Sequence, residues 1–132
     1  MDSIIFDDKI TENNYKEFVS KIMDVFSLSS YDKSILFSLE FVESDCVMKL
    51  AIIHQDGNSQ NYPEIRVDSN ESYFFDFLNY MVSEFRNHCE ITKEDIVNLD
   101  DDHYVAFRMI TKYNDLITMD GLTESQANRF LG

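Results

Sequence analysis

Residues 34–54 read SILFSLEFVESDCVMKLAIIH, and this stretch predicts the centre of the fold. From Ser34 to Val42, large apolar residues occupy every second position, which is the period of a strand with one buried face. The polar residues 43–45 then indicate a turn. From Val47 to His54 both faces are apolar except at Lys49, as is typical of a strand inside a sheet. We therefore expect two neighbouring antiparallel strands here.

Three further strands are expected from weaker patterns. A turn signal in residues 56–58 precedes a short strand around Ile65 and Val67, which would complete an antiparallel meander. Apolar residues alternate again in 104–112 and in 116–119, on either side of a turn. Residues 92–95 are expected to form only a short helical turn or a loop.

Two long apolar stripes predict helices, the first over residues 13–27 and the second over residues 69–88. Thr123 and Gln126 have the spacing of a capping box, which predicts the start of a short closing helix. The length of the chain suits one domain, so residues 1–132 are expected to form a single acidic domain. The predicted fold is α+β, an antiparallel sheet of about five strands with helices packed on one face, in the order α-βββ-α-ββ-α.

Acidic residues dominate the charge of the chain, with 25 Asp and Glu against 11 Lys and Arg and a formal net charge of -14. The excess is even along the sequence, at -5, -4 and -5 in successive thirds of 44 residues. Because 14% of the residues are aromatic, these charges belong to a folded surface rather than to a disordered tail. Such a surface repels nucleic acid and anionic lipid and attracts basic proteins.

The same pattern predicts where the protein works and what it binds. No apolar run approaches the roughly 18 residues of a membrane span, and the first residues lack the pattern of a signal peptide. Two cysteines suit a reducing compartment, so a cytoplasmic location is expected. We expect no direct contact with nucleic acid or membrane. The expected partner is a basic protein, such as a nuclease or another nucleic-acid-binding enzyme.

Residues that carry catalytic or metal chemistry are few and unfavourably spaced. The soft metal ligands are Cys46, Cys89, His54, His88 and His103, and none of them forms a paired zinc-binding motif. Phosphate-binding glycine loops and hydrolase motifs are also missing from the sequence. We therefore expect a protein that is not an enzyme and that has no cofactor and no metal.

The densest run of acids falls in residues 90–102, and the sequence leaves three readings of it open. It can be a solvated loop, a contact patch for a basic partner, or a site for a hard cation, although the spacing of an EF-hand is absent. As a contact patch it would act together with aromatic anchors. The predicted partner-binding residues are Glu90, Glu94, Asp95, Asp100, Asp101, Asp102, Tyr104 and Phe75.

Two functions fit these observations. In charge and size the chain resembles phage anti-restriction and anti-CRISPR proteins and toxin-immunity proteins, which implies a non-enzymatic inhibitor that occludes a basic, nucleic-acid-handling protein. As the alternative, the predicted element order is similar to that of the small acidic chaperones of type III secretion. That resemblance implies a dimer that binds a segment of an effector. Monomer and homodimer both stay open at this point.

Overall fold

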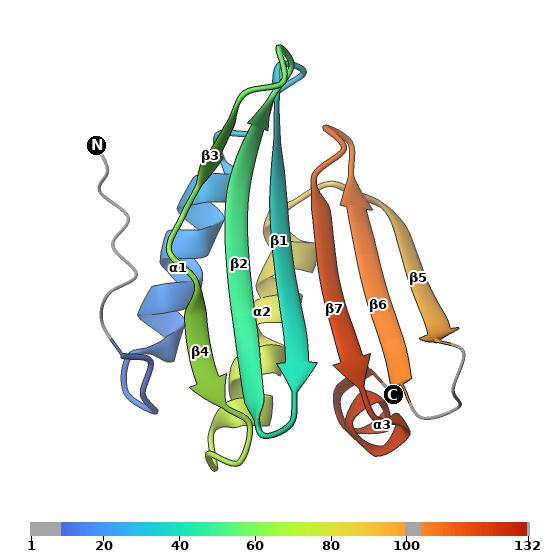
Figure 1. Ribbon diagram of the computed structural model, residues 1–132. Helices are drawn as coiled ribbons and strands as arrows, with labels where there is room; N and C mark the ends of the chain where they lie inside the picture. Colours follow the sequence, from blue (N-terminus) through green and yellow to red (C-terminus); the bar gives the residue numbers. More distant parts are fainter. Residues whose placement is uncertain (1–8, 100–103, 132) are drawn as a thin grey trace.

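Seven strands form one mixed sheet in the computed structural model, which describes residues 9–99 and 104–131 (Figure 1). The strands are β1 (Lys33–Val42), β2 (Asp45–His54), β3 (Ser59–Asn61), β4 (Ile65–Asp68), β5 (Ile91–Leu99), β6 (Tyr104–Thr111) and β7 (Leu116–Leu122). Their order across the sheet is β3-β2-β1-β7-β6-β5, and β4 also pairs with β2. The two predicted central strands are confirmed as β1 and β2, which pair antiparallel over their whole length.

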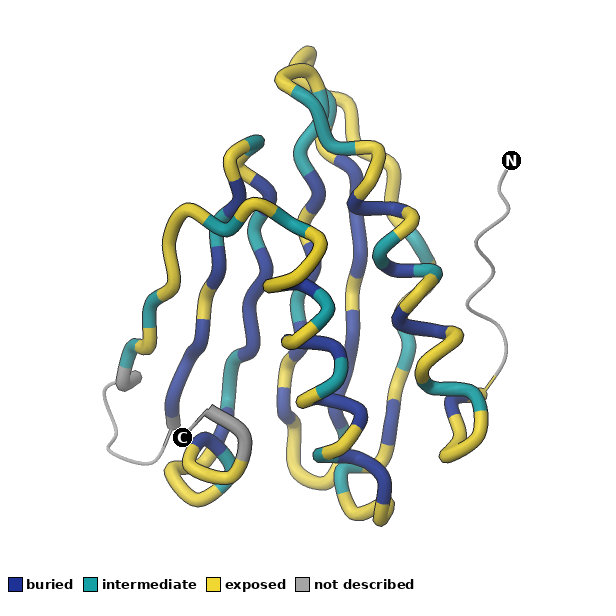
Figure 2. The backbone as a smooth tube through the Cα atoms, turned by 180° about the vertical axis from the view of Figure 1, so that it is seen from behind, coloured by how far each residue is buried: buried dark blue, intermediate teal, exposed yellow. Residues whose placement is uncertain are grey.

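Helices cover one face of this sheet, as predicted (Figure 2). They are α1 (Tyr15–Phe26), α2 (Phe74–His88) and α3 (Glu124–Leu131). The two long helices α1 and α2 lie side by side across the sheet, and α3 packs against α2, β6 and β7 at one end. None of the helices in the described part of the chain is long and apolar enough to cross a membrane.

The prediction of a purely antiparallel sheet was wrong, because β1 and β7, which meet in the middle of the sheet, are parallel. β1 lies beside β7, with Phe37 opposite Ile117 and Leu39 opposite Met119. Each half of the chain forms its own antiparallel meander, and the parallel pair joins the two halves. Turn residues in a sequence predict hairpins between neighbouring strands, whereas no local pattern predicts a pairing between residues about 80 positions apart.

The predicted number of strands was also wrong, since residues 91–99 form β5 rather than a turn. This strand lies at the edge of the sheet, and its polar residues are in register with β6, for example Asp95 with Arg108. Edge strands in proteins often carry charges, which hide the apolar alternation of a strand. The second missed strand, β3, has three residues, all exposed, and therefore no apolar signal.

The core lies between the sheet and α1 and α2. Both predicted apolar stripes face it, since Val19, Ile22 and Val25 of α1 are fully buried. From α2, the ring of Phe85 contacts Phe26 at 5.1 Å between centroids and Phe37 at 5.7 Å. Aromatic contacts of this kind add to the stability that burial provides.

A buried carboxylate joins the two halves of the sheet at one end. Asp115, only 2% exposed, accepts hydrogen bonds from the backbone N–H of Ile35 at 2.7 Å, from the hydroxyl of Ser29 at 2.7 Å and from that of Thr111 at 2.8 Å. These donors belong to the start of β1, to the segment before it and to the end of β6. Asp115 therefore satisfies polar groups that would otherwise be buried without partners.

Candidate partner-binding surface

The predicted partner-binding residues do not lie together in the fold. Glu90, Glu94 and Asp95 follow the β5 edge, whereas Phe75 belongs to the first turn of α2 at one end of the molecule. Tyr104 is the first residue of β6, where its backbone is in register with Leu99. The run Asp100, Asp101 and Asp102 lies outside the described residues.

Each described acid of this predicted site has a basic partner within the chain. The carboxylate of Glu94 accepts two hydrogen bonds from the guanidinium of Arg86, at 3.0 and 3.2 Å. Glu90 pairs with Lys112 at 2.8 Å, and Asp95 pairs with Lys93 at 3.4 Å. Such exposed pairs contribute little to stability, but they reduce the charge that the β5 edge offers to another protein.

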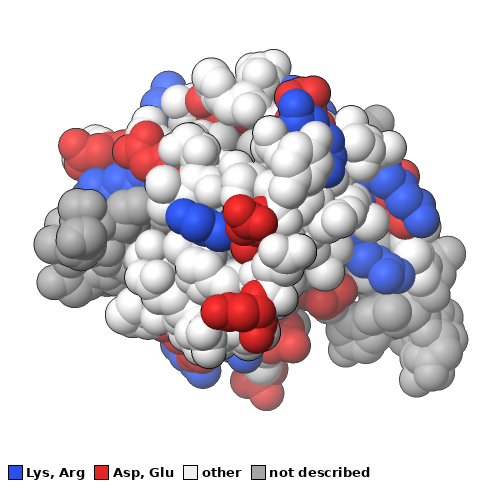
Figure 3. Space-filling model, turned by 90° about the horizontal axis from the view of Figure 1, so that it is seen from above, with Lys and Arg blue, Asp and Glu red and all other residues white. Residues whose placement is uncertain are grey.

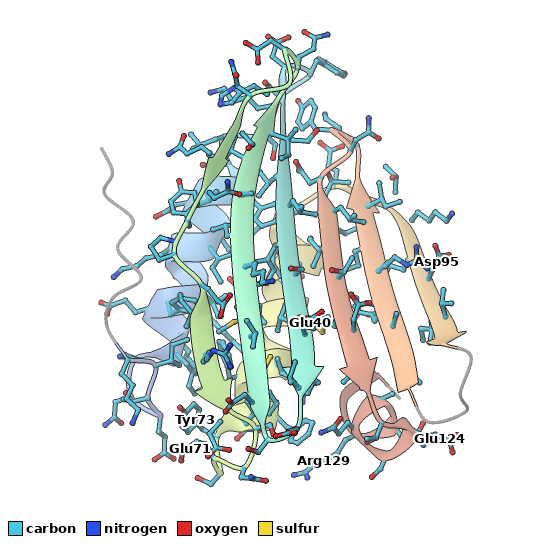
Figure 4. The ribbon with its side chains drawn as sticks, in the orientation of Figure 1. Glu40, Glu71, Tyr73, Asp95, Glu124 and Arg129 are labelled. Carbon is cyan, nitrogen blue, oxygen red and sulfur yellow. The ribbon has the colours of Figure 1, made fainter. Side chains whose placement is uncertain are left out.

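A group of acids without ion pairs lies at the end of the molecule where β1, β4 and β7 finish and where α2 and α3 begin. We call this region the lower end, as it appears in Figures 1 and 4. Within the described residues, five exposed carboxylates here form no ion pair: Glu43, Asp68, Glu71, Asp76 and Glu124. They come from a turn, a strand end, a loop and two helices. Only the fold brings them to one surface.

Local structure explains why the chain accepts some of these charges. Asp76 and Glu124 lie in the first turns of α2 and α3, where a negative charge is favourable to the helix dipole. The predicted capping box is confirmed at α3, because the Gln126 N–H donates to the Thr123 hydroxyl at 3.1 Å and the Thr123 N–H donates to the Gln126 side chain at 2.9 Å. Helix starts therefore hold the acidic side chains in place at the lower end.

A hollow of about 340 Å³ opens beside Glu71, between the β4–α2 connection and α3. Phe75 and Glu71 line it from one side and Arg129 from the other. The guanidinium of Arg129 lies 4.2 Å from the centre of the Phe75 ring, and Phe75 also contacts Phe74 edge to face at 5.3 Å. Figure 4 places Glu71, Arg129 and Glu124 along the same end of the molecule. The lower end thus combines carboxylates with a half-buried aromatic ring.

The negative potential of this end affects a neighbouring phenol. The Tyr73 hydroxyl donates to the carbonyl oxygen of Ile10 at 2.8 Å. Burial raises the pKa of Tyr73 above its usual value, and the carboxylates of Glu71 and Asp68 raise it further. The negative potential of these carboxylates disfavours the phenolate, and the same potential would attract a cationic side chain of a partner.

The opposite end of the molecule has a different character. Figure 3 shows acidic and basic side chains interspersed there among uncharged ones. A groove of about 610 Å³ lies at this end, between the last turns of α1 and α2 and the β6–β7 turn. Its size and its cysteine make it the natural place to look for a reactive group.

The cysteine thiol of that groove is not activated as a nucleophile. Burial, and to a smaller extent the nearby Asp115 carboxylate, raise the pKa of the Cys89 thiol to about 11. The thiol is therefore protonated at neutral pH, and a thiol in that form is a weak nucleophile. The neighbouring His88 is exposed and pairs with Glu84 at 3.2 Å. Within residues 9–99 and 104–131, no three metal-binding side chains gather.

Sequence reasoning named Phe75 as a candidate but none of the five acids of the lower end. Glu43, Glu71 and Glu124 are far apart in the chain, and none belongs to an acidic run. A density of charge along the sequence was the only available signal, and it pointed to residues 90–102. Comparison of the chain with protein-family models, with curated proteins and with solved structures found no significant match.

Proposed function

We propose that this protein is a non-enzymatic inhibitor whose acidic lower end docks into a basic groove of a nucleic-acid-handling protein. The observation that carries the proposal is the group of five exposed carboxylates that have no ion pair within the described residues and that lie at one end of the fold, where Glu71 and Phe75 line a hollow. Carboxylates in this arrangement can replace phosphates as ligands of lysine and arginine side chains.

The whole charge of the protein supports the same function. A body with a net charge of -14 is drawn to a basic surface at long range, which raises the association rate. Unpaired acids then provide short-range contacts without first breaking an ion pair of their own. Phe75, half-buried and already in contact with Arg129, supplies an apolar centre of the kind on which binding energy concentrates.

The first step of the test is to find the partner. The tagged protein is used to capture proteins from an extract of the source organism at low salt, and the captured proteins are eluted with increasing salt and identified. The proposal predicts a basic partner with a nucleic-acid site, whose association rate falls steeply as salt rises. Salt-independent capture of a secreted protein would favour the chaperone alternative instead, although the observed fold has two strands more than the order on which that resemblance was based.

Two matched variants then locate the interface. The variant Glu43→Gln/Glu71→Gln/Glu124→Gln removes three charges at the lower end. The control Glu90→Gln/Glu94→Gln/Asp95→Asn removes three charges at the β5 edge. We expect the first to raise the Kd for the partner by at least about tenfold and the second by less than about threefold, because the β5 acids are already paired. Equal changes in Kd for the two variants would contradict the assignment of the lower end as the partner-binding surface.

A third variant addresses the acidic run outside the described residues. Asp100→Asn/Asp101→Asn/Asp102→Asn also removes three charges, so its effect can be compared directly with those of the other two. If this variant raises the Kd for the partner strongly while the lower-end variant leaves the Kd unchanged, the interface lies in residues 90–102. That result would refute docking through the lower end.

A further inference from the structure

None of the three described helices covers the face of the sheet opposite α1 and α2 (Figure 1). Apolar side chains lie on this face between polar ones. Six large apolar side chains in the described part of the chain are classed as exposed, and three of them lie on this face. They are Leu36 at 37%, Val42 at 46% and Ile53 at 38% exposure. Val47 and Ala51 of β2 belong to the same face, but at 4% and 8% exposure they are covered by their neighbours and offer little surface to a partner.

Charges in the middle of this face balance, although the chain as a whole carries a net charge of -14. The cross-strand registers define three central rows of side chains, running from β2 through β1, β7 and β6 to β5. These rows contain three acids and three bases, namely Glu40, Asp95, Asp120, Lys49, Lys93 and Arg108. The next row towards the lower end adds Asp45, which pairs with Arg66 at 3.5 Å. Two copies that meet on this face therefore bring together nearly neutral surfaces rather than strongly acidic ones.

Four of these charges lie at the centre and form no ion pair within the described residues. Glu40 and Asp120 are side by side in the parallel register of β1 and β7. Burial raises the pKa of Asp120, the Glu40 carboxylate raises it further, and Arg108 partly offsets both effects. In the adjacent row, Lys49 and Arg108 flank the pair formed by Ser38 and Thr118.

We propose that two copies of this chain form a homodimer by packing these open sheet faces against each other. The twofold axis runs across the strands, between the row that contains Glu40 and Asp120 and the row that contains Lys49 and Arg108. It places the acidic pair of one copy over the row that holds the basic pair of the other copy. Glu40 then lies over Ser38 of the second copy and beside its Lys49. Asp120 lies over Thr118 of the second copy and beside its Arg108. Each of these four charges, which form no ion pair within the described residues, then faces an opposite charge of the other copy, and the twofold symmetry repeats every contact.

The area of the face suits such a dimer. Six strands spaced about 4.8 Å apart, with a mean length near 25 Å, make a face of about 600 Å² per copy, or about 1,200 Å² for the pair. This value is at the lower limit of stable interfaces, so the complementary charges are expected to decide whether the dimer forms. The strands of the two copies would run within about 30° of each other, as in aligned sheet packing. The charges that pair across this face differ from the five carboxylates of the lower end, so the dimer does not depend on the proposed inhibitory function.

The test is sedimentation analysis of the whole chain from about 1 to about 100 µM protein, where dimers with a micromolar Kd dissociate and form. The salt is set near 0.15 M, because a Debye length of about 8 Å then screens the repulsion between two acidic bodies. We expect a species of twice the 15.5 kDa chain mass at high concentration. A chain that stays monomeric over this range would overturn the proposal.

Charge exchange tests the twofold arrangement itself. Glu40→Lys and Lys49→Glu are each expected to raise the dimer Kd by about thirtyfold or more, since each contact occurs twice. The double variant Glu40→Lys/Lys49→Glu restores opposite charges across the axis and is expected to bring the Kd back to within about threefold of the original. Asp24→Lys makes the same change of charge on α1, in the helix layer on the other side of the sheet, and is expected to leave the dimer intact. Circular dichroism checks that each variant folds, and a double variant as weak as the single variants would refute the arrangement.

Discussion

Replacing Gly121 by alanine is expected to destabilise the protein much more than the same change at Gly57. Both glycines have a positive φ, +86° and +96°, so alanine at either position costs about 1–2 kcal/mol of conformational energy. At Gly57 an added Cβ meets nothing within 4 Å. At Gly121 it would lie 2.7 Å from the carbonyl oxygen of Phe41, which belongs to the neighbouring central strand. Overpacking of this kind adds about 1–3 kcal/mol, so we expect a total loss of about 2–5 kcal/mol at Gly121.

Urea unfolding followed by far-UV circular dichroism measures this difference, since the chain has no tryptophan to report by fluorescence. All variants are compared at one protein concentration, because a dimer makes the midpoint depend on concentration. The excess loss of Gly121→Ala over Gly57→Ala isolates the close approach of β7 to β1. Equal losses for the two variants would mean that β7 does not lie against β1 at this point, which would refute the parallel centre of the sheet.

Two other predictions concern buried groups. Asp115→Ala is expected to lower the free energy of unfolding by about 3–4 kcal/mol in the same assay, because it leaves the Ile35 N–H and two hydroxyls without their acceptor. A loss below about 1 kcal/mol would contradict the structural role of this carboxylate. Alkylation of Cys89 by iodoacetamide at pH 8 is expected to be about a hundredfold slower than that of an unperturbed thiol, and its rate is expected to rise about tenfold per pH unit until the pH nears the pKa of about 11. Cys89→Ser provides the control that excludes Cys46, and rapid alkylation of Cys89 at pH 7 would show that its thiol is not held protonated.

The parts of the fold that sequence reasoning predicted are those with a local pattern. The stripes of α1 and α2 were visible because their apolar residues recur with the period of a helix and face one core. The strands β1 and β2 were visible because one is half-buried and the other is buried on both faces over most of its length. The capping box of α3 was visible because both of its hydrogen bonds are local.

The parts that were missed depend on contacts between distant residues. The parallel pairing of β1 with β7 leaves no mark in either strand, since both remain apolar and half-buried under any arrangement. β5 was hidden by residues such as Lys93, Glu94 and Asp95, whose charges are satisfied by ion pairs that only the fold creates. For the same reason the sequence predicted an interface at the acidic run, whereas the fold leaves unpaired acids at the lower end.

The claim that this protein occludes a nucleic-acid site is tested most directly by competition. The captured partner is immobilised and exposed to a duplex DNA that it binds, with and without a saturating amount of the acidic protein. We predict mutually exclusive binding, with the duplex and the protein displacing each other, and loss of this competition for the variant Glu43→Gln/Glu71→Gln/Glu124→Gln. A ternary complex in which the partner holds the duplex and the protein together would contradict the claim.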